Sequence, residues 1–307
     1  MLRDREPPPH VYFVVSAVFH YLGPSFAVLL FARVQVLGVA WLRIASAAVV
    51  FAIWRRPWRT LRELDPSTQR LLIAWGAVLA VMNCCFYEAI ARLPLGTVAA
   101  IEFLPVVALA AIGTRTPRNA VALALAVCGV YELSHVQLTA RPLGLAFAFA
   151  NAALFTAYIV LAHAVARHPA VKGIDGLGAA MLIAAIVVTP LAGSQAASAI
   201  GDPLALLAGV GVGICSSVIP YVTDQLAMTR LSRATYSLMV SLLPAIATVI
   251  GVIVLAQLPT AAELVGVALV VGGVAVHREQ DEGADSLHSR SPKEYGRPDP
   301  GNWRERA

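Results

Sequence analysis

A small number of charged side chains lie inside long apolar stretches of this sequence. Arg43, Glu102 and Asp224 are the clearest cases. A charge at the middle of a bilayer costs roughly 2.5–3.5 kcal/mol on insertion scales, so such residues usually face a wet cavity or one another. A carboxylate there suits an ammonium group or a proton, and the planar guanidinium of Arg43 suits either Glu102 or a substrate carboxylate. We therefore interpret these three residues as candidates for substrate and proton binding.

Three prolines interrupt the same kind of apolar stretch. Pro105 stands one turn after Glu102, Pro220 stands one turn before Asp224, and Pro244 lies in a third stretch. Proline lacks a backbone N–H, so a carbonyl one turn earlier loses its helical partner and, in lipid, needs protein or water instead. We interpret all three prolines as helix breaks. The remaining polar candidates for the binding region are His20, Tyr21, Asn83, Tyr158 and Tyr221.

Membrane-spanning helices must position these residues. The chain has 307 residues, of which 58% are hydrophobic and only 13% are charged, and this excludes a soluble globule. It also excludes a nucleic-acid-binding protein, despite the net charge of +5. The apolar runs are long and lack period-2 alternation, so we predict an all-α integral membrane protein with ten transmembrane helices. The predicted spans are 11–31, 36–54, 70–91, 95–113, 118–135, 143–166, 176–194, 203–228, 233–256 and 260–277.

The positive charges predict how the chain lies in the membrane. Of the 23 Lys and Arg residues, 19 fall in the termini and loops on the side of the N-terminus, and 3 fall on the other side. We therefore expect a multi-pass protein of the cell (inner or plasma) membrane with both termini in the cytoplasm. Residues 1–10 form a polar cytoplasmic lead. Residues 279–307 are polar and nearly free of aliphatic side chains, which predicts a disordered cytoplasmic tail.

A weak internal repeat divides the spans into two halves. The segment Ala91–Thr97 matches Thr229–Thr235 at three positions, and Leu104-Pro105 matches Leu243-Pro244 one residue out of step. Each half would hold five spans, over 11–135 and 143–277. Because five is odd, the two halves would be inverted relative to each other, which is a pattern of secondary transporters.

Other polar and small residues in the spans are interpreted as structural. Glu88 precedes Arg92 by four residues, a spacing that predicts a local ion pair. Asn151 is expected to form an interhelical hydrogen bond, and Gly209-x-x-x-Gly213 predicts a helix contact face. Thr260-x-x-Glu263 predicts a capping box at the start of the last span.

Three motifs resemble those of the EamA-type drug/metabolite transporters, in particular the threonine/homoserine exporter-like branch. They are Ala100–Pro105, Ser216–Tyr221 and Thr229–Pro244, and the resemblance extends over spans two to ten. It implies ten helices in two inverted five-helix halves, and export of small metabolites, amino acids among them, driven by the proton gradient.

The resemblance also assigns individual residues. It matches Glu102 to an acidic position of the fourth helix, Arg43 to a basic position of the second, and Tyr158 to an aromatic position of the sixth. Asp224 stands where the family usually has Glu, and Gln257 stands where an acid is common.

The sequence favours a proton-coupled exporter of a small amino acid, such as threonine or homoserine, that works by alternating access. Its expected partners are a small-molecule substrate, protons and membrane lipid, without nucleic acid, and a homodimer is left open. No cofactor and no metal are expected. The main alternative is an efflux carrier for hydrophobic cations or drugs. An intramembrane enzyme is less favoured because the motifs H-E-x-x-H and G-x-S-x-G are absent. A channel is likewise a less favoured alternative, and it differs from a coupled carrier in that it would not accumulate substrate against a concentration gradient.

Overall fold

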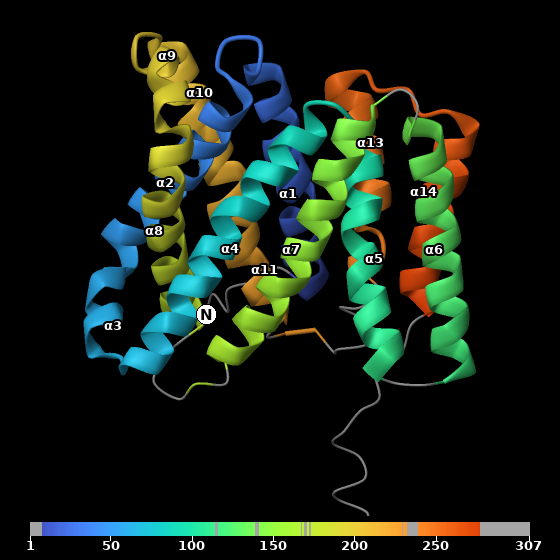
Figure 1. The fold of residues 1–307 in the computed structure, drawn as a ribbon, viewed down its shortest axis with the longest axis horizontal. Coiled ribbons are helices and arrows are strands. Elements are labelled where there is room, and N and C mark those ends of the chain that lie inside the picture. The colour runs from blue at the N-terminus through green and yellow to red at the C-terminus, as the bar shows by residue number, and fades with distance from the viewer. Residues whose placement is uncertain are drawn as a thin grey trace, which may run out of the picture.

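The computed structural model describes residues 8–113, 116–138, 141–166, 168, 171, 173–228, 230–231 and 239–276. Within these residues every regular element is a helix and no strand occurs, as the apolar pattern predicts. The long helices run side by side, up and down along one common direction (Figure 1). The predicted tail at 279–307 and most of the predicted lead lie outside the described residues.

The helices follow the predicted apolar stretches closely. The first part of the chain forms α1 (Pro9–Leu30), α2 (Val36–Arg55), α3 (Pro57–Glu63), α4 (Pro66–Ile90), α5 (Leu95–Gly113) and α6 (Pro117–Leu138). The second part forms α7 (Pro142–Ala166), α8 (Gly173–Ala192), the 3-10 turn η1 (Gly193–Ala196) and α9 (Ala197–Ile200). It continues with α10 (Pro203–Gly213), the π-helical turn η2 (Ile214–Val218), α11 (Ile219–Met228), α13 (Leu243–Leu255) and α14 (Ala261–Val276).

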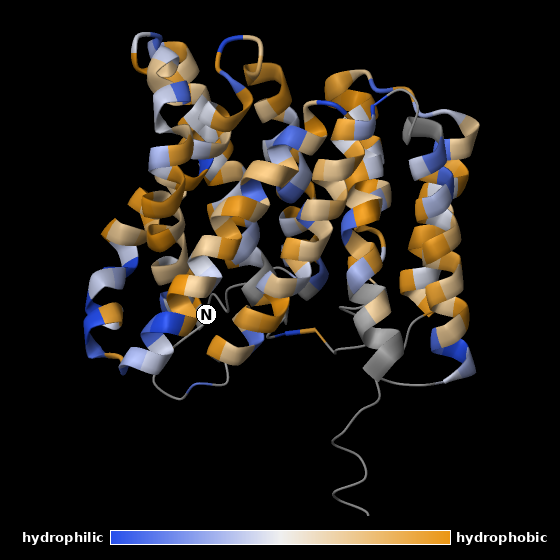
Figure 2. Cartoon of the chain, in the orientation of Figure 1, coloured by the Kyte–Doolittle hydropathy of each residue, from blue (hydrophilic) through white to orange (hydrophobic). Residues whose placement is uncertain are grey.

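The short helix α3 lies where the sequence analysis expected a loop. Arg56 adopts a left-handed conformation with φ 51° and closes α2. Pro57 then opens α3, since its fixed φ suits the first helical position and its missing N–H is not needed there. This turn brings a strongly basic segment to one end of the molecule, where Figure 2 shows hydrophilic residues gathered around α3 and the start of α4.

Six helical segments of the described chain are long and apolar enough to cross a membrane. They are His10–Leu30, Val36–Arg55, Pro66–Ile90, Pro142–Val165, Ile174–Ile200 and Pro203–Thr223. Many large apolar side chains point outward, among them Ile53 at 77% and Ile253 at 76% exposure. A water-soluble monomer rarely exposes so much apolar surface, whereas lipid covers it at no cost.

The helices pack in pairs that join the two parts of the chain. Helix α2 packs against α8 and α10, α4 against α7 and α8, and α1 against α11 and α13. Helix α5 packs against α6, α7, α13 and α14, and α6 against α14. In Figure 1, α2, α8 and α10 accordingly stand at one side, and α5, α6, α13 and α14 stand at the other, with α1, α4 and α7 between them.

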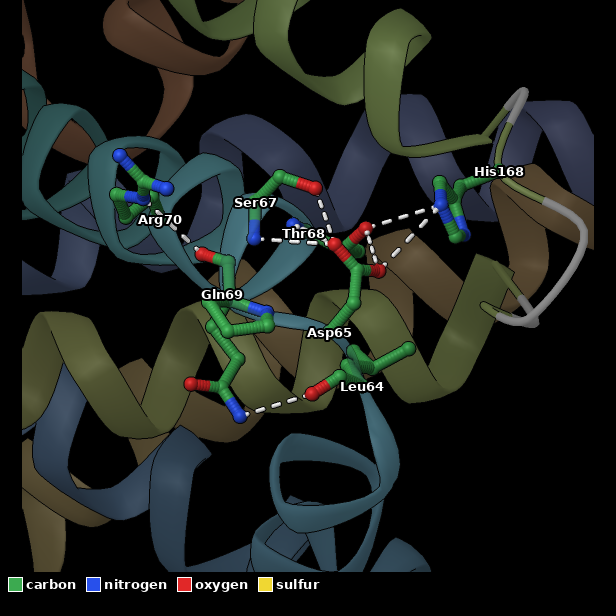
Figure 3. A network of polar contacts seen from close by, with 8 residues as sticks. Leu64, Asp65, Ser67, Thr68, Gln69, Arg70 and His168 are labelled. Atoms are coloured by element: carbon green, nitrogen blue, oxygen red, sulfur yellow. Dashed lines mark hydrogen bonds and ion pairs between the residues drawn. The ribbon is translucent and has the colours of Figure 1, made fainter.

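A polar network fixes the start of α4 (Figure 3). The Asp65 carboxylate accepts the backbone N–H groups of Ser67 at 3.0 Å and Thr68 at 3.1 Å, together with both hydroxyls. His168, which lies between α7 and α8, contacts the Thr68 hydroxyl through Nε2 at 2.9 Å. The hydrogen bonds from Ser67 and Thr68 hold the pKa of Asp65 well below its ordinary value of 3.8. The network therefore caps α4 and ties it to the connection before α8.

Candidate functional site

Glu102 lies on α5, one turn before Pro105, and is buried with 7% of its surface exposed. Its Oε1 atom accepts a hydrogen bond from Nδ2 of Asn151 on α7, at 3.1 Å. This contact confirms the predicted interhelical role of Asn151. The Oε2 atom has no protein partner among the described residues. Because a carboxylate can accept about four hydrogen bonds, Glu102 retains most of its capacity for a ligand or a proton.

Arg43 lies on α2 and is equally buried, at 7% exposure. Its guanidinium donates from Nε to Oγ of Ser217 at 3.1 Å and from Nη2 to the carbonyl of Ser216 at 3.2 Å. The guanidinium also lies 5.5 Å from the ring centroid of Tyr87 on α4. Arg43 is close enough to Glu102 to act on it electrostatically, but no ion pair joins the two within the described chain. The guanidinium is therefore held by neutral groups.

The two acceptors for Arg43 stand on the π-helical turn η2. In a regular helix, the N–H of residue 220 would bond the carbonyl of Ser216, but Pro220 has no N–H. The freed carbonyl accepts the Arg43 hydrogen bond instead. The carbonyl of Pro220 in turn accepts the hydroxyl of Ser16 on α1, at 3.1 Å. The interruption at Pro220 thus supplies acceptors to two neighbouring helices.

Close contacts between helices place η2 beside Arg43. A Cβ added to Gly213 would lie 2.7 Å from the Arg43 carbonyl oxygen, and one added to Gly23 on α1 would lie 2.5 Å from the Ser216 Cβ. A Cβ on Gly209 would lie 2.6 Å from Cδ1 of Leu42. The predicted contact face at Gly209 and Gly213 is therefore confirmed, and it packs on α2.

Helix α1 completes this region with two aromatic side chains. His20 and Tyr21 have their ring centroids 5.1 Å apart, and Tyr21 is only 1% exposed. His20 lies near Arg43, and Tyr21 lies near Glu102. Side chains from α1, α2, α4, α5, α7 and η2 therefore meet in what we call the central polar cluster, whose members are His20, Tyr21, Arg43, Tyr87, Glu102, Asn151, Ser216 and Ser217.

For three other predicted site residues the structure gives contacts with residues outside this cluster. Asn83 is buried and donates to the carbonyl of Leu79 in its own helix, at 2.8 Å. Tyr158 lies two turns beyond Asn151 on α7 and packs against the ring of Trp75, with the centroids 5.6 Å apart. Tyr221 is half-buried on α11 beside the apolar residues of α2, α4 and α8. Asp224 also stands on α11, but its side chain lies outside the described residues.

The three prolines take different places in their helices. Helix α5 continues through Pro105 to Gly113. Pro220 is the second residue of α11, the helix that begins directly after the π-helical turn. Pro244 stands in the first turn of α13, where the missing N–H is tolerated. Of the predicted span 233–256, residues 239–256 are described, and the helix α13 covers Leu243–Leu255.

Sequence reasoning missed Ser216, Ser217 and Tyr87 as members of the cluster. In residue type, the sequence offered nothing that set these two serines and this tyrosine apart from the other serines and tyrosines of the predicted spans. The position of Pro220 did carry a signal, because the carbonyl that it frees belongs to Ser216. The predicted ion pair between Glu88 and Arg92 is confirmed, and it lies apart from the cluster.

Known proteins resemble this chain over most of its length. The threonine/homoserine exporter RhtA of Escherichia coli (strain K12) is 32% identical over 271 residues, which cover 86% of this chain and 88% of that protein. RhtA of Salmonella typhimurium (strain LT2) is 32% identical over 257 residues, covering 81% of this chain and 84% of the relative. The model of the EamA-like transporter family matches residues 142–277.

The chain belongs to the EamA-like transporter family. Its resemblance to that family, stated above from three motifs, is thereby confirmed. EamA-like proteins are transporters, so the chain is a multi-pass membrane protein and not an enzyme. One solved crystal structure is similar in fold, with a TM-score of 0.50 and 22% identity, and the match covers 87% of this chain and 96% of the other.

Proposed function

We propose that this EamA-like protein exports a small amino acid, such as threonine or homoserine, in exchange for protons. The relatives that carry the name threonine/homoserine exporter support the substrate class. The single observation on which the proposal depends is the central polar cluster, where the Glu102 carboxylate and the Arg43 guanidinium are both buried without pairing to each other. A zwitterionic amino acid offers one group of opposite charge to each of them.

The proposed roles follow from this chemistry. Arg43 binds the substrate carboxylate, since a guanidinium matches a carboxylate with two parallel hydrogen bonds. Glu102 binds either the substrate ammonium group or a proton, and it cannot hold both at once. His20 and Tyr21 shape the cavity beside these charges. Asp224, Asn83, Tyr158 and Tyr221 remain proposed contributors along the path, and Pro105, Pro220 and Pro244 remain proposed points of helix flexibility.

Alternating access requires two halves that can rock about the cluster. The helix pairing supports two related halves. If α1, α2, α4, α5 and α6 are taken to correspond to α7, α8, α11, α13 and α14, most contacts within one set of pairs have a counterpart. The inversion of the halves follows from the proposed five spans in each. The contact of α4 with α7 corresponds to that of α11 with α1, and the contact of α5 with α7 corresponds to that of α13 with α1. The pairs α2 with α8, α5 with α13 and α6 with α14 each correspond to themselves. The proposed arrangement is ten spans with both termini in the cytoplasm, following the distribution of Lys and Arg.

The alternative carrier of hydrophobic cations is less compatible with this cluster. Arg43 holds a positive charge within electrostatic reach of Glu102. That charge would repel a cationic drug, and removing it would improve transport of such a compound. The charge is, by contrast, needed for a substrate that carries a carboxylate.

Transport by purified protein in liposomes tests the proposal. With an imposed pH gradient, labelled threonine or homoserine should accumulate against its concentration gradient, and a proton ionophore should abolish the accumulation. Amino acids with large aromatic side chains and hydrophobic cations serve as comparisons. Transport that runs only down the substrate gradient would contradict proton coupling, and transport restricted to cations would contradict the substrate class.

A further inference from the structure

The hydrogen bonds of Arg43 use only one edge of its guanidinium. A guanidinium has a side edge formed by Nε and Nη2, and an end edge formed by Nη1 and Nη2. The side edge is occupied, because Nε donates to Ser217 Oγ at 3.1 Å and Nη2 donates to the Ser216 carbonyl at 3.2 Å. Nη1 donates a hydrogen bond to no described residue, and the neutral hydroxyl of Tyr87 on α4 lies beside the guanidinium. Resting on the proposed function, we propose that Ser217, together with the Ser216 carbonyl freed by Pro220, is a positioning residue that holds Arg43 with its end edge towards the substrate carboxylate.

The backbone around η2 leaves the Ser216 carbonyl available to accept a hydrogen bond from Arg43. π-Helical turns are rare and occur frequently at functional sites. Here the turn η2 and the adjoining Pro220 leave the Ser216 carbonyl without a regular helical donor. In a membrane interior, an unpaired carbonyl is unfavourable because no water is present to hydrogen-bond to it. Arg43 therefore satisfies the carbonyl, and the carbonyl fixes Arg43.

The surroundings leave the guanidinium little freedom to turn away. Ser216 and Ser217 are each 1% exposed, and the Tyr87 ring lies 5.5 Å from the guanidinium carbon. The close approaches at Gly23 and Gly213 hold η2 against α1 and α2. Both acceptors are neutral, so they orient the positive charge without cancelling it. This combination distinguishes a positioning role from a structural ion pair.

The hydrogen bonds also connect the two halves of the chain. Arg43 belongs to α2 in the first half, and its acceptors belong to η2 in the second half. A movement of η2 relative to α2 would release the side edge and let the guanidinium turn. The affinity for the substrate carboxylate would then depend on how the halves are arranged, as a transport cycle requires.

Variants of Ser217 separate positioning from packing. The readouts are the KM and maximal rate for threonine in liposomes, and inhibition by threoninol, which replaces the carboxylate with a hydroxymethyl group. Ser217→Ala should raise the KM for threonine about tenfold, because a hydrogen bond to a charged group is lost. It should leave the maximal rate and threoninol inhibition nearly unchanged. Ser217→Thr keeps the hydroxyl and should restore the KM.

A second variant tests the freed carbonyl, and a third serves as the control. Pro220→Ala supplies an N–H that competes with Arg43 for the Ser216 carbonyl, so it should also raise the KM for threonine and spare threoninol. Ser25→Ala removes a buried hydroxyl whose one hydrogen bond among the described residues is to the Tyr21 carbonyl of its own helix, at 2.9 Å, and it should change neither readout. Thermal unfolding in detergent checks that each variant is folded.

The outcomes distinguish this inference from the proposed function. An unchanged KM in both Ser217→Ala and Pro220→Ala overturns the positioning role and leaves amino-acid export standing. Equal losses for threonine and threoninol also overturn it, because they indicate damage that does not depend on the carboxylate. If the wild type transports no substrate that carries a carboxylate, the proposed function fails and the inference fails with it.

Discussion

Two arginines of helix α2, Arg43 and Arg55, are held in contrasting ways. Arg55 stands at the end of the helix and pairs with Asp175 on α8, with Nε and Oδ1 2.7 Å apart. Arg43 stands in the middle of the helix and, among the described residues, donates to the neutral groups of Ser216 and Ser217, with the neutral side chain of Tyr87 beside it. The charge at the helix end is neutralised by a fixed partner. The charge in the middle is oriented but not neutralised, so it can attract an anionic group.

The acids of the first half show the same difference. Glu88 pairs with Arg92 one turn later on its own chain segment. Within the part of the chain that the structure describes, the one hydrogen bond of Glu102 comes from the neutral amide of Asn151. Both unpaired charges therefore lie in the central polar cluster, whereas the paired ones lie outside it. Since an uncompensated buried charge is costly, we regard this pattern as a mark of function.

Replacing each arginine by lysine should give the largest difference between the two residues, measured as the KM for threonine. Arg43→Lys keeps the charge, but a compact ammonium cannot reproduce the planar guanidinium, which offers one edge to the serine acceptors and a second edge to a substrate carboxylate. We expect the KM for threonine to rise by more than about tenfold. Arg55→Lys should change the KM less than twofold, because Asp175 can pair with either cation. Similar KM values for the two variants would remove the distinction drawn here.

Two neighbouring glycines of α10 test whether close packing at η2 matters. A Cβ on Gly213 would lie 2.7 Å from the Arg43 carbonyl, whereas a Cβ on Gly211 would meet nothing within 4 Å. Gly213→Ala should therefore destabilise the protein by about 1–3 kcal/mol, as overpacking typically does. Gly211→Ala should be neutral. Thermal unfolding of the two purified variants compares them directly, and an unshifted transition in Gly213→Ala would contradict the close approach.

A double-mutant cycle measures how strongly Arg55 and Asp175 stabilise the fold by pairing with each other. Arg55 and Asp175 keep 32% and 18% of their side-chain surface exposed, so water screens their attraction. We expect a coupling free energy of about 0.2–1 kcal/mol between Arg55→Ala and Asp175→Ala, decreasing at high salt. The measurement is the unfolding transition of the wild type, both single variants and the double variant. A coupling free energy well above this range that does not decrease at high salt would contradict the interpretation of Arg55 and Asp175 as an ion pair screened by water.

The smallest effect is expected at the capping network of Figure 3. Asp65→Asn should lower the unfolding temperature slightly at neutral pH, because the ionised carboxylate accepts stronger hydrogen bonds from Ser67 and Thr68. The pKa of Asp65 is depressed in the folded state, so its contribution is present above the ordinary value of 3.8 and is lost as the pH falls below it. The difference between wild type and variant should therefore shrink in acid. A difference that grows in acid would contradict the cap.

Most of the helices could be predicted from the sequence, because apolar runs bounded by Gly and Pro leave few alternatives. The predicted span 95–113 coincides with α5, and 36–54 ends one residue before α2 does. Helix α3 was missed because it depends on a local backbone reversal at Arg56 rather than on hydropathy. The π-helical turn was missed because it depends on contacts with Gly23 and Arg43, which are far away in the chain.

Only the charged members of the candidate site could be predicted from the sequence. Arg43 and Glu102 stood out against an apolar background and prove to lie in one cluster with His20 and Tyr21. The neutral members Ser216, Ser217 and Tyr87 did not stand out, since similar residues occur at helix contacts throughout the chain. Only the tertiary structure shows which serines bond to Arg43.

The central claim is that Glu102 couples substrate export to the proton gradient. Glu102→Gln keeps the size of the side chain and removes its ability to exchange a proton, and Glu132→Gln, on the exposed face of α6, is the matched control. In liposomes with an imposed pH gradient, Glu102→Gln should abolish uphill accumulation of threonine while the protein remains folded and the control accumulates normally. Full proton-driven accumulation by Glu102→Gln would contradict the account.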